Sequence, residues 1–166
     1  MEQFNFVVTL LAALGTGLLA GNFFAFSAYL MRALTGLSAE RGIVAMQAIT
    51  AAIKSIPFLI LFFGTAVLCA VLFSTAILAW GKPDAYYRLA GTLFFLLGTF
   101  PVTMMANRPL NNRLAIASPD TQEGRELWKR IQSSWAAWNH VRTVTALAAC
   151  ALLILALAAS GNPFAH

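Results

Sequence analysis

The stretch "SIPFLILFFGTAVLCAVLFSTAILAWG", residues 55–81, contains no charged side chain. About 18 consecutive apolar residues are enough for a helix to cross a bilayer. Over the whole chain 60% of the residues are hydrophobic and only 10% are charged, whereas about a quarter are charged in ordinary soluble domains. The stretch therefore predicts a membrane-spanning helix.

Three other charge-free runs occur before and after this one, at residues 3–31, 89–107 and 143–165. The first run follows Glu2 and lacks the basic start of a secretory signal, so we expect it to be retained. The sequence predicts an all-α, four-transmembrane-helix bundle. We expect a single integral membrane domain over residues 1–166, with spans at about 5–31, 55–80, 89–107 and 143–160.

The basic residues are distributed unevenly among the loops. Nine of the 11 flank the first and third loops, whereas the second loop has only Lys82 and Arg88. By the positive-inside rule, the first and third loops are cytoplasmic and both termini lie outside the cytoplasm, which predicts an integral protein of a bacterial inner membrane. Because these charges occupy short loops and form no single basic face, a nucleic-acid partner is excluded.

Two segments outside the spans have helical patterns. In residues 38–54, Met46, Ile49 and Ile53 recur at helical spacing beside a polar stripe that includes Gln47, which predicts a short interfacial helix. This helix either caps the bundle or forms one wall of a site.

The third loop contains "SPDTQEGREL", residues 118–127, with Ser118 as the expected N-cap and Pro119 at the first helical position. Nothing between that point and Ser160 forces a break in the helix except Gly124. We therefore expect one helix to run from the loop through the fourth span, so that its first half is a cytoplasmic extension.

Two polar motifs occur at the same expected membrane depth, "NRPLNN" at residues 107–112 and "WAAWNHVRT" at residues 135–143. On a helical wheel, Trp135, Trp138, Asn139 and Arg142 share one broad face, and His140 points away by about a third of a turn. Polar groups at membrane depth are costly, which makes them candidates for function. The alternatives are an interfacial tryptophan belt, asparagine caps and an Arg142 side chain that reaches the interface.

The side chains available at these motifs restrict the chemistry. A transition metal normally takes three or four His, Cys or carboxylate ligands. The chain has two histidines, one of them His166, and its six acids lie outside the predicted spans, so we expect neither a metal nor a cofactor. A neutral-range base, an arginine and tryptophans suit a flat, apolar, weakly acidic aromatic molecule that enters from the membrane.

With "GLLAGNFFAFS" (residues 17–27) and "AMQAI" (residues 45–49), these motifs make most of the chain resemble the anthrone oxygenase family of small four-helix membrane proteins. Fungal polyketide-pathway members of that family oxidise anthrones to anthraquinones without an evident cofactor. The resemblance implies an oxygenase-like site that includes the asparagine motif and the tryptophan, histidine and arginine motif.

We therefore predict a membrane-embedded, oxygenase-like enzyme that assists the reaction of an anthrone- or quinol-type substrate with O₂. The expected catalytic residues are the base His140, the anion-stabilising Arg142, and Asn107. The expected substrate-binding residues are Trp135, Trp138, Asn111, Asn139, Gln47 and Asn22. The alternative is a non-catalytic membrane protein that binds a quinone, a lipid or a haem-like ligand, or that serves as an assembly partner. Membrane lipid is an expected partner in either case, and homo-oligomer formation is left open.

Overall fold

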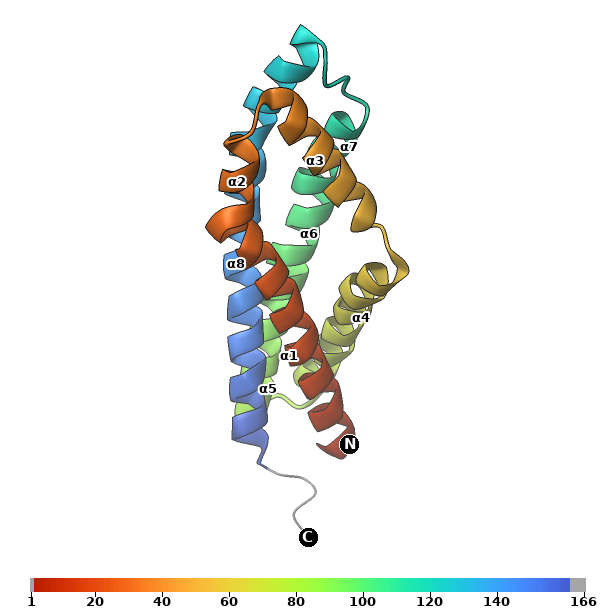
Figure 1. Ribbon diagram of the computed structural model, residues 1–166. Coiled ribbons are helices and arrows are strands. Elements are labelled where there is room, and N and C mark those ends of the chain that lie inside the picture. The colour runs from red at the N-terminus through yellow and green to blue at the C-terminus, as the bar shows by residue number, and fades with distance from the viewer. Residues whose placement is uncertain (1, 162–166) are drawn as a thin grey trace.

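The computed structural model describes residues 2–161, which form helices along almost their whole length. Four helical segments are long and apolar enough to cross a membrane, at Glu2–Thr35, Ile56–Leu78, Pro83–Ala115 and Gln122–Ser160. The predicted all-α fold with four spans is therefore confirmed. Figure 1 shows that the first of these segments begins and the last one ends at the same end of the bundle, as an even number of spans requires.

The first span is one continuous helix built from α1 (Glu2–Ala25), the π-helical turn η1 (Phe26–Leu30) and α2 (Met31–Thr35). After a short connection, α3 (Ala39–Ala52) runs obliquely across the end of the bundle and leads to α4 (Ile56–Leu78). The predicted short helix of the first loop is thus present, and we call this end of the molecule the α3 end (Figure 1).

The third span combines α5 (Pro83–Leu93), η2 (Phe94–Thr99), α6 (Phe100–Val102), η3 (Thr103–Asn107) and α7 (Arg108–Ala115). Each π-helical segment lies just before a proline, Pro101 or Pro109. A wider turn accommodates a ring that has no N–H to donate and would clash with an earlier carbonyl. The helix therefore continues through both prolines and is longer than the predicted span of residues 89–107.

The longer third span includes Arg88, which we expected in a loop. The structure places it inside α5, where its side chain is buried. The expectation was wrong because an Asp84 carboxylate one helical turn earlier pairs with the guanidinium and allows the charge to be buried.

The last helix, α8 (Gln122–Ser160), confirms the prediction of one helix from the third loop through the fourth span. Its start differs from the prediction, because the N-cap is Thr121 and not Ser118. The Gly124 N–H donates to Thr121 Oγ1 over 3.1 Å, while the Ser118 carbonyl accepts the Thr121 hydroxyl in a preceding turn. Thr121 thus takes the capping role that sequence spacing gave to Ser118.

Helix α8 packs along α1 and α5 in the spans and against α3 and α7 at the α3 end. Buried residues of the spans form one apolar cluster, and a second cluster at the α3 end includes Ile43, Met46 and Trp128. Two polar contacts fasten α3 to its neighbours. Gln47 Nε2 donates to the carbonyls of Leu114 and Ala117 over 2.9 Å each. Arg125 of α8 forms an ion pair with Glu40 of α3.

Candidate functional site

The central charge of the candidate site is Arg142, on the inward face of α8 with 6% of its surface exposed. Its Nη2 donates to Asn139 Oδ1 over 2.7 Å. The guanidinium carbon lies 4.3 Å from the centre of the Phe23 ring and 5.4 Å from that of Trp135. The six acids of the chain are at positions outside this cluster, so a neutral amide and two aromatic rings hold the cation.

Asn139, fully buried, fixes the position of this arginine. Its Nδ2 donates to the Phe23 carbonyl and to Ser27 Oγ, over 2.8 Å each. Ser27 Oγ also lies 3.0 Å from Thr143 Oγ1. Asn139 therefore links α8 to the first span, through Phe23 in α1 and Ser27 in η1. Its side-chain oxygen, Oδ1, accepts the hydrogen bond from Arg142.

The asparagine motif approaches the same region from the third span. Asn107 Nδ2 donates to the Trp135 carbonyl over 3.2 Å, and Trp135 Nε1 donates to Asn111 Oδ1 over 2.8 Å. Asn107 and Trp135 are both buried. The two motifs singled out in the sequence thus contact each other directly, with Trp135 between the asparagines and Arg142.

Two buried polar atoms of this cluster have no hydrogen-bond partner among the described residues, Arg142 Nε and Asn107 Oδ1. Most buried polar atoms in proteins are paired, so unpaired ones require an explanation. One is a donor and the other an acceptor, and both residues contact Trp135, Arg142 at its ring and Asn107 at its backbone carbonyl. The cluster thus has unused hydrogen-bonding capacity of both kinds.

His140 and Trp138 lie outside the cluster. His140 is exposed on the outer face of α8, and Trp138 is 45% exposed. Residues two positions apart on a helix point about 200° apart. The structure therefore does not bring His140 and Arg142 together on one face of α8. The prediction that His140 is the catalytic base is tested by the variant described below.

The two remaining residues also lie apart from the guanidinium. Gln47 binds the carbonyls at the end of α7, which favours the interpretation that α3 caps the bundle. Asn22 is half-buried on α1, and no hydrogen bond joins its side chain to the rest of the described chain. Sequence reasoning omitted Phe23 and Thr143, although each lies four positions from a cluster member, Ser27 and Asn139 respectively.

The described residues contain no group of three or more His, Cys, Asp or Glu side chains that could hold a metal ion. The cluster instead offers an arginine, amides, hydroxyls and aromatic rings. Together, fold and cluster define a small helical membrane protein with a positively charged site inside its bundle.

The sequence profile of the anthrone oxygenase family matches residues 58–152, more than half of the chain. The chain therefore belongs to the anthrone oxygenase family. The matched range includes Asn107, Asn111, Trp135 and Arg142, and it excludes the α1 residues that anchor Asn139. Neither the curated proteins nor the solved structures contain a match.

Proposed function

We propose that this protein is a membrane-embedded, oxygenase-like enzyme that acts on an apolar aromatic substrate of the anthrone or quinol type. The observation that carries the proposal is the buried Arg142 charge, which is held by Asn139, Phe23 and Trp135 without a carboxylate. Such a charge favours an anion that develops beside it in a low-dielectric site. Membership of the anthrone oxygenase family supports this assignment.

The proposed chemistry begins when the substrate CH₂ group loses a proton to water and becomes a delocalised oxyanion. Arg142 stabilises that oxyanion, and Asn107 Oδ1 accepts a hydrogen bond from a substrate hydroxyl. The electron-rich anion transfers an electron to O₂ and then forms a C–O bond, which gives a hydroperoxide after protonation. Loss of water leaves the ketone, so that one CH₂ group and one O₂ yield one C=O group and one H₂O.

The test of this proposal is turnover by the purified protein in lipid nanodiscs. With anthrone as substrate, O₂ consumption should rise in proportion to protein, with one anthraquinone formed per O₂. Protein-free nanodiscs give the rate of spontaneous oxidation. Saturable anthrone binding with O₂ uptake no faster than that background would contradict the proposal and would identify a non-catalytic binding protein.

His140 provides a separate prediction. Because its side chain faces away from Arg142, we expect His140→Ala to leave kcat for anthrone unchanged within about threefold, whereas loss of a general base typically costs about 10²–10⁴-fold. The measurement is O₂ uptake per folded protein, with Trp138→Ala as a neighbouring exposed control. A loss of a hundredfold or more, confined to the histidine variant, would establish His140 as the base.

The proposed orientation places the α3 end in the cytoplasm. With Arg88 and Arg142 set aside as buried, eight basic residues belong to that end and only Lys82 to the other. In intact cells, a Lys129→Cys protein should resist a membrane-impermeant maleimide, and a Trp80→Cys protein should react. Both cysteines should react after the membrane is permeabilised. The reverse pattern in intact cells would place the α3 end outside.

A further inference from the structure

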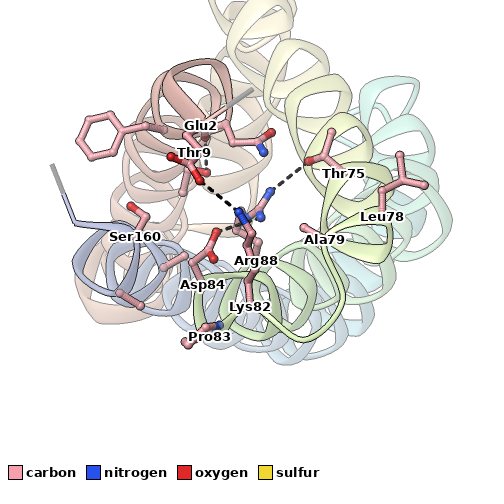
Figure 2. A pocket seen from close by; sticks show the side chains of 14 residues that line it. Glu2, Thr9, Thr75, Leu78, Ala79, Lys82, Pro83, Asp84, Arg88 and Ser160 are labelled. Atoms are coloured by element: carbon pink, nitrogen blue, oxygen red, sulfur yellow. Dashed lines mark hydrogen bonds and ion pairs between the residues drawn. The ribbon is translucent and has the colours of Figure 1, made fainter. Parts of the chain in front are cut away.

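A second polar site lies at the opposite end of the bundle from α3. A cavity of about 400 Å³ opens there between α1, the α4–α5 connection and the end of α8. Figure 2 shows the cavity, with Arg88 at its centre and Glu2 and Lys82 at its rim. Apolar side chains, including those of Phe6, Leu78 and Ala156, form much of its wall.

Arg88 is the most buried charged residue of this cavity, with only 2% of its surface exposed. Its Nη2 pairs with Asp84 Oδ2 over 2.9 Å, and its Nη1 donates to Thr75 Oγ1 over 3.1 Å (Figure 2). Its Nε is buried and has no partner in the described part of the chain. Nε is therefore a guanidinium nitrogen whose N–H donates to no described residue.

An unused acceptor belongs to Asn5, a residue of α1 that lines the same cavity. Asn5 lines the cavity, and its Oδ1 is buried and has no hydrogen-bond partner among residues 2–161. The four charged residues of the lining form two ion pairs, Arg88 with Asp84 and Lys82 with Glu2. Because each cation already has a carboxylate, an anionic ligand would have to displace one of these pairs.

We propose that this cavity binds a neutral phenolic ring compound from the membrane. A phenol oxygen accepts the hydrogen bond of Arg88 Nε, and a phenolic O–H donates to Asn5 Oδ1. The apolar walls cover the ring, whose burial provides most of the affinity. The balanced charges select the neutral phenol over an aromatic carboxylate of the same size.

This inference concerns binding and does not depend on the proposed oxygenase activity. The cavity lies at the end of the bundle opposite to Asn107 and Asn111, and no residue of its lining belongs to the Arg142 cluster. The two proposed aromatic sites thus each contain a buried arginine. Arg142 has no carboxylate partner in its cluster, whereas Arg88 is paired with Asp84.

The test uses 2-naphthol, which is neutral at pH 7 because phenols ionise near pH 10, and 2-naphthoate, which is anionic. Binding to the full-length protein in nanodiscs is measured by fluorescence titration against empty nanodiscs. We expect a saturable phase of 2-naphthol binding that depends on this cavity, and no such phase for 2-naphthoate. Asn5→Leu should weaken 2-naphthol binding by about 2- to 10-fold, as expected for the loss of one neutral hydrogen bond. Ala159→Trp should abolish this phase, because this exposed position lines the cavity and the ring would fill it.

Two controls locate the bound molecule. Ser160→Ala should have no effect, since this residue lines the cavity but its hydroxyl already donates to the Leu157 carbonyl over 2.9 Å. Gln47→Leu, at the α3 end and away from this cavity, should also leave this binding phase unchanged. Binding of 2-naphthol that is fully retained in Ala159→Trp would overturn the proposal, and so would a 2-naphthoate phase that Ala159→Trp removes, or the absence of saturable 2-naphthol binding.

Discussion

Replacement of Arg142 with methionine should lower the anthrone turnover number by about 10²–10³-fold, because loss of one preorganised group that stabilises an oxyanion typically costs that much. The protein should remain folded. Methionine is unbranched and fills a similar apolar space, and replacing a buried charge with a well-packed apolar side chain is often neutral or stabilising. We therefore expect a thermal midpoint in detergent no lower than that of the wild type, together with a severe loss of O₂ uptake.

Arg142→Lys is the matched control for this prediction, because it keeps the positive charge and removes the planar guanidinium. A lysine lacks both the fork that donates to Asn139 Oδ1 and the flat surface that faces the Phe23 ring. We expect its turnover to lie between those of the wild type and Arg142→Met. Wild-type turnover in a folded Arg142→Met protein would exclude Arg142 from the reaction.

The four spans could be predicted from the sequence because a bilayer tolerates few charges, and charge-free runs mark the helices directly. Asn107, Asn111 and Asn139 could be singled out for the same reason, since polar amides are costly at that depth, and Trp135 belongs to the same motif as Asn139. Their contacts in the structure join the third span to α8 and α8 to α1.

What the sequence did not show depends on pairing in three dimensions. Arg88 looked like a topogenic loop charge, because only the helical register that places Asp84 one turn away, together with Thr75 on another helix, reveals that it is buried. His140 was expected to be a base because it is the one histidine within the two polar motifs, but the register of α8 directs that side chain away from Arg142. Gln47 was expected to bind substrate, and its partners are backbone carbonyls more than 60 positions away.

Asn139 should be essential to the stability of the wild type and less important once the arginine is gone. Asn139→Leu removes the acceptor of the Arg142 Nη2 hydrogen bond, along with the hydrogen bonds to the Phe23 carbonyl and to Ser27 Oγ. Loss of a hydrogen bond to a buried charge costs more than loss of a neutral one. We expect Asn139→Leu to lower the free energy of unfolding by about 2–4 kcal/mol.

In the Arg142→Met background, the same Asn139→Leu substitution should cost about 1–2 kcal/mol less, because no buried guanidinium is left unpaired. The measurement is a double-mutant cycle of reversible unfolding in mixed micelles. Gln47→Leu is the control, since Gln47 binds only the end of α7 and should combine with Arg142→Met additively within about 0.5 kcal/mol. Equal costs of Asn139→Leu in the two backgrounds would show that Asn139 serves only to join α1 to α8. A coupling confined to Asn139 would establish that the amide compensates for the buried charge on which the proposed oxygenase site depends.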